Sequence, residues 1–307
     1  MGLTRADLTD PKISDKDKAE IAVAIANYMS NDKWVAKTFL PVGILLTGHP
    51  GSRSYMRACV DSHKKLGYWI TLAYDNYINP EHESADYNSL LPPKDIMDKI
   101  DTFVMPKWQS WGGVAFPYFW QLKFGINVMQ DFEYIYCCNA DCMLEKPEGF
   151  PELFNLMGDA DIMSCGPVTD RSVNTTAFIA KSKVAKLIME HFERHFIPFE
   201  NYEKYTQEFG NAEGRFGRAI KDLGLKQIIV SPPKNEQLPA PGQGTWFDLV
   251  GLRHLHYEVN YAYRYKGIPP PFKYLDERYL GDADKTYIKL YEETGNPEVL
   301  KDWYAKD

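Results

Sequence analysis

The chain has 307 residues, of which 44% are hydrophobic and 25% are charged, a composition typical of a globular protein that buries a full core. Its formal net charge of −7 argues against nucleic acid as a partner, because phosphate binding needs a basic surface. The sequence has no run of about 18 apolar residues and has a polar, charged N-terminus, so it predicts neither a membrane-spanning helix nor a signal peptide. The five cysteines lack zinc-ligand spacing, which predicts buried reduced thiols and a cytoplasmic protein.

The first part of the chain predicts a strand–helix–strand unit after a helical extension. Residues 1–40 are charged and then show apolar residues at helical spacing, a pattern that Pro41 ends. The apolar run 42–47 predicts a strand, followed by a loop, a helix that Gly67 ends, and a second strand over 68–74. Because strands joined by a helix form right-handed parallel units, we expect these two strands to be parallel.

The rest of the chain continues to alternate between strand and helix patterns. The expected elements are a short helical piece at 96–100 within an insertion over 78–117, helices at 119–129, 150–156, 184–191 and 216–223, strands from 134 and at 160–165 and 174–180, a loop at 231–244, and a terminal helix from 285. This order predicts an α/β fold, a mostly parallel sheet flanked by helices. We expect a helical extension over 1–40, the α/β domain over 41–262 and a helical tail over 263–307.

The most informative stretch lies where a run of strand-forming residues over 134–138 stops at Asn139-Ala140-Asp141. In open α/β sheets, ligands bind beyond the carboxyl ends of the strands. Asn139 and Asp141 are two residues apart, so on an extended backbone their side chains point the same way and can converge on a hard cation such as Mg²⁺ or Mn²⁺. The alternative is an ordinary turn at the end of a strand, where Asn and Asp are common.

The loop from Thr47 to Arg53 precedes the beginning of a helix, which is a natural anion site. It lacks the glycine spacing of a phosphate-binding loop or of a dinucleotide-binding turn. We expect Thr47, His49 and Arg53 to contact an anionic ligand, although Arg53 can equally cap the loop. Asp75, at the end of the second strand, can accept hydrogen bonds from a base or a ribose, or can be a plain turn residue.

Taken together, the strand over 42–47, the strand that ends in Asp75, and the helix leading to an acid-tipped strand resemble the GT-A class of nucleotide-sugar glycosyltransferases. The resemblance covers roughly residues 42–260 and implies a GT-A-like (Rossmann-like) sheet. In that class the acid after the second strand reads the nucleotide base, and an Asp-x-Asp motif holds the divalent ion that bridges the donor diphosphate. Asp75 and Asn139-Ala140-Asp141 match these two features, and the helical segment 120–127, with Lys123, matches a donor-binding helix.

The resemblance also implies a histidine that completes the metal site. His254 and His256 share a face if residues 252–257 form a strand, and we favour His256 because it lies closer to Arg264 and Lys266. An imidazole ligand favours Mn²⁺ over Mg²⁺, and Lys266 can neutralise phosphate oxygens. The alternatives are hydrogen-bonded, partly buried histidines and a solvated basic loop.

One residue departs from the pattern of the class, because Asn139 stands where an acid is expected. A neutral amide weakens the affinity for a cation or shifts the coordination to Asp141 and the histidine. It is also compatible with an enzyme that needs no metal, or with one that has lost its activity.

Glu213 is the candidate general base. The segment 211–218 resembles the helix whose leading acid faces the acceptor, and Glu213 lies three residues before Phe216, at the head of an apolar stripe. Burial there would raise the pKa of the carboxyl into a useful range for a base. The alternative is an acid favourably placed in the first turn of a helix that Asn211 caps.

The sequence thus predicts a glycosyltransferase that moves a sugar from a nucleotide-diphosphate sugar, with a UDP-sugar favoured, to a hydroxyl of a glycan or another acceptor. Direct displacement with inversion follows if Glu213 is the base. The alternatives are a nucleotidyltransferase of related fold, and a catalytically silent module that binds nucleotide sugars. Fold resemblance by itself does not decide among them.

Overall fold

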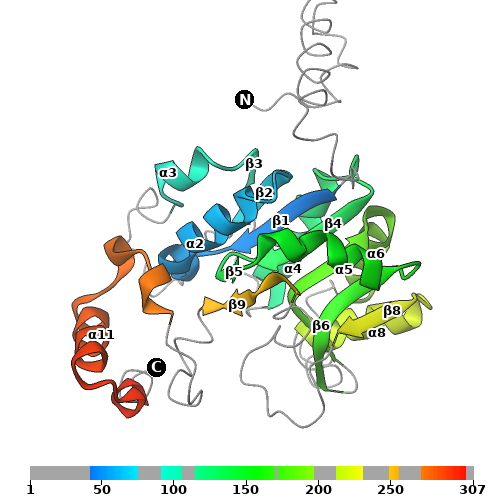
Figure 1. Ribbon diagram of the computed structural model, residues 1–307. Helices are drawn as coiled ribbons and strands as arrows, with labels where there is room; N and C mark the ends of the chain where they lie inside the picture. The colour runs from blue at the N-terminus through cyan, green and yellow to red at the C-terminus, as the bar shows by residue number, and fades with distance from the viewer. Residues whose placement is uncertain are drawn as a thin grey trace, which may run out of the picture. The chain divides into compact units, whose positions relative to one another are not determined.

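The computed structural model describes residues 42–74, 91–105, 115–169, 172–196, 212–230, 249–255 and 271–301 (Figure 1). These residues belong to one compact unit that begins at Val42. The expected helical extension over 1–40 and the loop over 231–244 lie outside the described residues. Among the helices that the structure describes, none has the length and hydropathy needed to cross a bilayer.

A seven-stranded sheet forms the centre of the unit, in the order β3-β2-β1-β4-β7-β6-β8. Its strands are β1 (Val42–Gly48), β2 (Trp69–Tyr74), β3 (Thr102–Val104), β4 (Tyr134–Asn139), β6 (Ile162–Thr169), β7 (Ser172–Lys181) and β8 (Gln227–Val230). Every neighbouring pair is parallel except those of β7, which runs antiparallel to β4 and to β6. The expected α/β fold with a mostly parallel sheet is confirmed.

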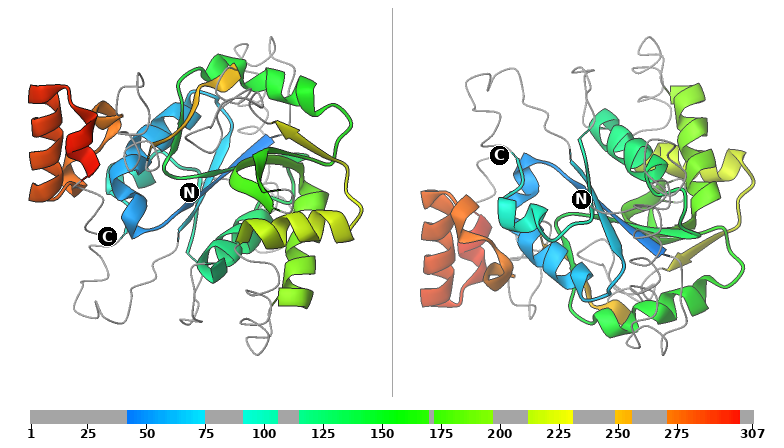
Figure 2. Two further views of the ribbon diagram at one scale, coloured as in Figure 1. Left: turned by 90° about the horizontal axis from the view of Figure 1, so that it is seen from below. Right: turned by 90° about the horizontal axis from the view of Figure 1, so that it is seen from above.

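Helices cover both faces of the sheet (Figure 2). They are α2 (Arg53–Lys64), α4 (Ala115–Asn127), α5 (Phe150–Met157), α6 (Ser182–Phe196) and α8 (Ala212–Asp222). The short helix α3 (Lys94–Met97) packs beside α2, and α11 (Asp282–Thr294) lies outside the layers that flank the sheet. The alternation of side chains along β4 explains this arrangement. Ile135 and Cys137 join a core cluster with apolar residues of α4, α6 and α8, whereas the Tyr136 ring packs against His63 of α2 and Phe150 of α5.

Three short strands were not foreseen from the sequence. Thr102–Val104 forms β3 at the edge of the sheet, inside the segment interpreted as an insertion, and Gln227–Val230 forms β8 at the other edge. Cys142–Leu144 forms β5, directly after the turn that contains Asp141. Strands of three or four residues are too short to show a periodicity in sequence, and their pairing partners decide whether they form.

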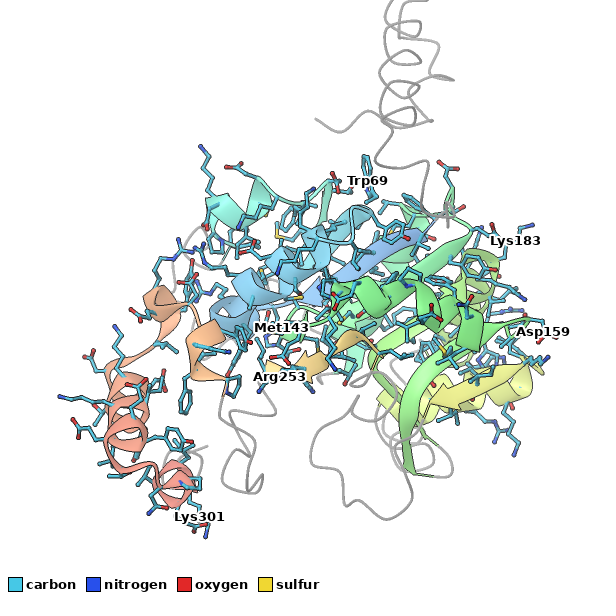
Figure 3. All side chains as sticks on the ribbon, in the orientation of Figure 1. Trp69, Met143, Asp159, Lys183, Arg253 and Lys301 are labelled. Atoms are coloured by element: carbon cyan, nitrogen blue, oxygen red, sulfur yellow. The ribbon has the colours of Figure 1, made fainter. Side chains whose placement is uncertain are left out.

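A second, two-stranded sheet lies beside the carboxyl end of β4. It pairs β5 with β9 (Leu252–His254) in an antiparallel ladder, in which Cys142 pairs with His254 and Met143 with Arg253. Met143 and Arg253 are labelled in Figure 3. The chain enters β9 through Gly251, which has a φ of +57°. A residue with a side chain would be strained in this conformation. This ladder brings a late segment of the chain to the end of the central strand.

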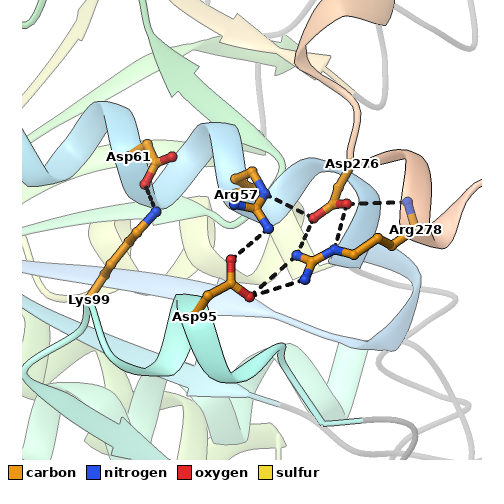
Figure 4. A network of polar contacts seen from close by, with 6 residues as sticks. All are labelled: Arg57, Asp61, Asp95, Lys99, Asp276 and Arg278. Atoms are coloured by element: carbon orange, nitrogen blue, oxygen red, sulfur yellow. Dashed lines mark hydrogen bonds and ion pairs between the residues drawn. The ribbon is translucent and has the colours of Figure 1, made fainter.

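The C-terminal segment is held against α2 and α3 by a network of ion pairs (Figure 4). Asp276 pairs with Arg57 at 3.0 Å and with Arg278 at 2.6 Å, and its backbone N–H donates to the Ser54 carbonyl at 2.7 Å. Hydrogen bonds from Arg278 outweigh the effect of burial and lower the pKa of Asp276 to about 2. The segment that carries α11 is therefore fastened beside the beginning of α2, next to the loop that follows β1.

Candidate functional site

Two strands of the sheet end together at the candidate site. Thr47 of β1 lies opposite Asn139 of β4, and its hydroxyl donates to Asn139 Oδ1 at 3.1 Å. The backbone N–H of Ala140 donates to the Thr47 carbonyl at 2.8 Å, which continues the ladder by one residue. Thr47 is buried, so the Asn139 amide is fixed against the sheet at the point where β4 ends.

Asp141 lies in the turn between β4 and β5, and its carboxylate meets a histidine from the far end of the chain. His254 Nε2 lies 3.2 Å from Asp141 Oδ2, and the backbone N–H of Leu255 donates to the Asp141 carbonyl at 2.9 Å. The side chains of His254 and Asp141 are 11% and 13% exposed. The pairing of β5 with β9 positions both residues, since His254 faces Cys142 in that ladder.

Cys142 supplies a third donor atom at this place. Its side chain is fully buried, and its Sγ lies 3.5 Å from Asp141 Oδ1, toward which the thiol donates. The ligand atoms of Asp141, Cys142 and His254 all lie within 4.8 Å of one another. Carboxylate oxygen, thiol sulfur and imidazole nitrogen are all protein ligands of divalent metals, so the donor set and its spacing fit a cation.

A buried polar cluster between α2 and β4 supports the site. His63 Nδ1 lies 2.8 Å from the Cys59 carbonyl, and His63 Nε2 lies 3.3 Å from the Tyr136 hydroxyl. The Cys59 thiol donates to the Asn139 carbonyl at 3.6 Å, and the Cys138 thiol does so at 3.5 Å. The end of β4 is thus held by side chains of α2 as well as by its neighbouring strand.

Burial and the nearby carboxylate set the protonation of this cluster. Burial, followed by charge on Cys138 and then on Asp141, raises the pKa of Cys59. Burial also raises the pKa of Cys142, together with the neighbouring Cys138 and Asp141. Burial and then Asp141 raise the pKa of Tyr55. For Cys138, hydrogen bonds from Cys142 and His63 outweigh burial and lower the pKa to about 6. The negative charge of Asp141 thus raises the pKa of several neighbouring groups. A bound cation would have the opposite effect on these pKa values.

The loop after β1 is closed on itself by its own side chains. His49 caps the short 3₁₀ turn Pro50–Ser52, with Nδ1 accepting from the Gly51 N–H at 3.2 Å, and the His49 side chain is exposed. Arg53 Nε donates to the Pro50 carbonyl at 3.0 Å, and its guanidinium lies 5.0 Å from the centre of the Tyr279 ring. Arg53 therefore caps the loop, while contact with an anionic ligand stays a prediction for His49 and Arg53.

The remaining candidates are not brought together with Asp141 in the same way. Lys123 pairs with Glu193 of α6 and lies 5.0 Å from the Trp120 ring centre, so its ammonium is engaged in the helical layer. Glu213 lies in the first turn of α8, but its side chain is not among those that the structure describes. Asp75, His256 and Lys266 lie outside the described residues, and their roles stay predictions.

The sequence does not single out Cys142 and Gln121 as members of the site, and it ranks His254 behind His256, whose role stays a prediction. The sequence predicts Cys142 only as a buried thiol. Gln121 has no signal in the sequence, and its buried side chain donates to the Gly48 carbonyl at 2.9 Å, which fixes the end of β1. From the sequence, the two histidines differ only in their distance to the basic residues Arg264 and Lys266, which favours His256. The register of β9 on β5 places His254, and no signal within residues 252–257 reveals that register.

No protein-family model matches the chain, and no curated protein matches it. Among solved structures, it is similar to a "putative nucleotide-diphospho-sugar transferase" from Desulfovibrio desulfuricans G20, with 8% identity, a TM-score of 0.39, and coverage of 69% of this chain and 94% of that chain. A likeness at this level carries no argument about activity. The proposed function therefore rests on the side chains of the site and on the motifs of the sequence.

Proposed function

We propose that this protein is a glycosyltransferase that uses a nucleotide-diphosphate sugar, with a UDP-sugar favoured, and a divalent cation. One observation carries the proposal: the Asp141 carboxylate and the His254 imidazole lie 3.2 Å apart directly after the central strand β4. Ligand sites in open α/β sheets lie beyond such strand ends. The same arrangement supports a cation held by Asp141 and His254, with the side chain of Asn139 beside it.

The chemistry needs charge stabilisation on the leaving diphosphate, which a divalent cation supplies when it is bound. In the proposal, Asp141 and His254 hold the cation. Asn139, fixed by Thr47 through its amide oxygen, presents its amide N–H groups to the donor. In the structure, Asp141 also accepts a hydrogen bond from the Cys142 thiol, which orients the carboxylate before a cation binds.

The other roles come from the sequence and stay part of the proposal. Glu213 takes the proton of the acceptor hydroxyl, and direct attack on the sugar then inverts its configuration. Asp75 binds the base or ribose. We expect the donor phosphates to contact the polar and basic side chains predicted from the sequence, which are His49, Arg53, Lys123 and Lys266. For Lys123 this contact requires release of its ion pair with Glu193.

A second candidate function is the binding of a nucleotide sugar without transfer. It is favoured by Asn139, a neutral residue whose amide oxygen already accepts from the Thr47 hydroxyl. Such an oxygen retains one lone pair for a cation, but it brings no charge. The two candidates make the same prediction for binding and differ in whether product forms.

The proposal is tested by thermal unfolding with a panel of nucleotides and nucleotide sugars, without a divalent cation and with Mn²⁺ or Zn²⁺. A ligand that binds the native state raises the melting temperature by mass action. We expect a nucleoside diphosphate to raise it only when Mn²⁺ or Zn²⁺ is present, and we expect Asp141→Asn to lose that rise while keeping the melting temperature of the unliganded protein. A panel without any such rise, or an equal rise in the variant, would show that the proposed site is wrong.

A further inference from the structure

The site at the end of β4 contains the sulfur atom of Cys142, a ligand type that hard cations do not prefer. Mg²⁺ and Mn²⁺ sites are built from oxygen ligands, whereas thiolates select softer metals such as Zn²⁺. The thiol of Cys142 points at the same carboxylate that His254 contacts, at 3.5 Å from Asp141 Oδ1. We propose that Asp141, Cys142 and His254 form a three-ligand site for a borderline-soft divalent ion, of the Zn²⁺ or Co²⁺ type, with Cys142 bound as the thiolate.

The spacing of the donors is close to what such an ion requires. Zinc binds sulfur at about 2.3 Å and nitrogen or oxygen at about 2.0–2.2 Å, so ligand atoms around a tetrahedral ion lie roughly 3.3–3.6 Å apart. His254 Nε2 lies 3.2 Å from Asp141 Oδ2, and Cys142 Sγ lies 3.5 Å from the other carboxylate oxygen, Asp141 Oδ1. All three ligand atoms lie within 4.8 Å of one another, so small side-chain rotations bring them onto one ion.

The surroundings suit this kind of ion. Cys142 and His254 face each other across the β5–β9 ladder, and the Leu255 N–H holds the Asp141 backbone at 2.9 Å, so each ligand is carried by hydrogen-bonded backbone. The thiol loses its proton to solvent when the metal binds, and the positive ion offsets the neighbouring carboxylate that otherwise disfavours a thiolate. Three protein ligands leave a fourth position open, which is typical of catalytic rather than structural zinc sites.

In the transferase proposed above, that fourth position would take a phosphate oxygen of the donor. The metal site itself does not rest on the proposed function, because it follows from the three side chains alone. The two can fail separately: the metal site has a spectroscopic test in the absence of any sugar nucleotide, whereas transfer is measured by its product.

The test is titration of the full-length, metal-free protein with Co²⁺ under reducing conditions, followed by absorption spectroscopy. Coordination by Cys142 predicts a thiolate-to-cobalt charge-transfer band in the near ultraviolet, together with the strong visible bands of four-coordinate cobalt, and displacement of both by one equivalent of Zn²⁺. A parent protein that binds Co²⁺ without the charge-transfer band, or that binds none, overturns the proposal.

Two variants identify the sulfur. Cys142→Ser should lose the charge-transfer band and bind Zn²⁺ at least about tenfold more weakly, since loss of an outer-shell partner alone costs roughly 10–100-fold. Cys137→Ser is the matched control, because Cys137 is equally buried in β4 but belongs to the core on the other face of the sheet, and it should keep the band. If Cys142→Ser fails to fold, Asp141→Asn and His254→Gln take its place. Each should bind Co²⁺ more weakly than the parent, so each should show a weaker charge-transfer band at the same Co²⁺ concentration. A band that survives in folded Cys142→Ser assigns the sulfur elsewhere and contradicts the proposal.

Discussion

His254 Nε2 lies 3.2 Å from Asp141 Oδ2, although the two residues are 113 positions apart in sequence. The contact depends on the β5–β9 ladder, in which Cys142 and His254 are direct partners. A shift of the ladder by one residue would turn the imidazole to the opposite side of the strand. The register of two three-residue strands therefore decides whether a histidine reaches the carboxylate.

The two histidines of residues 254–256 should differ in their effect on metal binding. We expect His254→Ala to weaken Zn²⁺ or Mn²⁺ binding by at least about tenfold, because it removes a ligand adjacent to Asp141. His256→Ala is the comparison, and calorimetric titration of both variants measures the difference. Loss of affinity only in His256→Ala would identify His256 as the ligand and contradict that role for His254.

Replacing Asn139 by an acid should strengthen the cation site. In Asn139→Asp the carboxylate can still accept from the Thr47 hydroxyl, and it adds a negative charge two residues from Asp141. We expect divalent affinity to rise by roughly tenfold, or about 1.4 kcal/mol. Asn296→Asp is the control, since it adds the same charge at an exposed helix cap that tolerates either residue. Equal affinity in the parent and in Asn139→Asp would show that residue 139 is remote from the ion.

Glu213→Gln should leave donor binding intact and lower turnover by roughly 10²–10⁴, the range for a lost general base. The alternative role for Glu213 is to stabilise the first turn of α8. Glu152→Gln, which removes an acid from the first turn of α5, controls for that effect on the melting temperature. Normal turnover in Glu213→Gln, with a loss of stability like that of the control, would assign Glu213 to the helix alone.

The ion pairs of Asp276 in the C-terminal segment should make the free energy of unfolding depend on pH below about pH 4. The pKa of Asp276 is about 2 in the folded protein and about 3.9 in an unfolded chain, so its stabilising effect is present above about pH 4 and is lost as the pH falls toward 2. We expect Asp276→Asn to lower the free energy of unfolding by about 2 kcal/mol at neutral pH and by progressively less in acid. Urea unfolding of the parent and the variant over this pH range measures the difference in their free energies of unfolding. A difference that stays the same in acid would contradict the stabilising role of the ionised Asp276.

The sequence predicted the parts of the fold that long, regular patterns determine. The apolar run of β1, the helical stripe of α2 that includes Met56 and Val60, and the strand ending at Tyr74 all lie where their periodicity placed them. The two strands also pair in parallel, as the rule for strand–helix–strand units requires. Patterns of this length reflect burial of one face, which is a property of the local sequence.

The sequence could not predict contacts made by pairing between distant short segments. Asp141 is a candidate from the sequence because it directly follows a buried strand, whereas Cys142 becomes a candidate ligand through the pairing of β5 with β9, which places His254 opposite it. The sequence likewise does not predict that β7 runs antiparallel to β4 and β6. Such pairings are determined by tertiary packing, which can override local preference.

The most direct test of the account is the release of nucleotide from nucleotide sugars in the absence of an acceptor. Glycosyl transfer at this site implies slow hydrolysis, because water can take the place of the acceptor beside an activated donor. The parent protein would be incubated with UDP-, GDP- and dTDP-sugars, with Zn²⁺ or Mn²⁺ and after chelation, and the released nucleoside diphosphate would be measured. We predict release from one donor class that requires the ion and disappears in Asp141→Asn. Tight binding of a nucleotide sugar with no release, either alone or with an acceptor-rich extract, would contradict transfer and identify a module that binds the donor without acting on it.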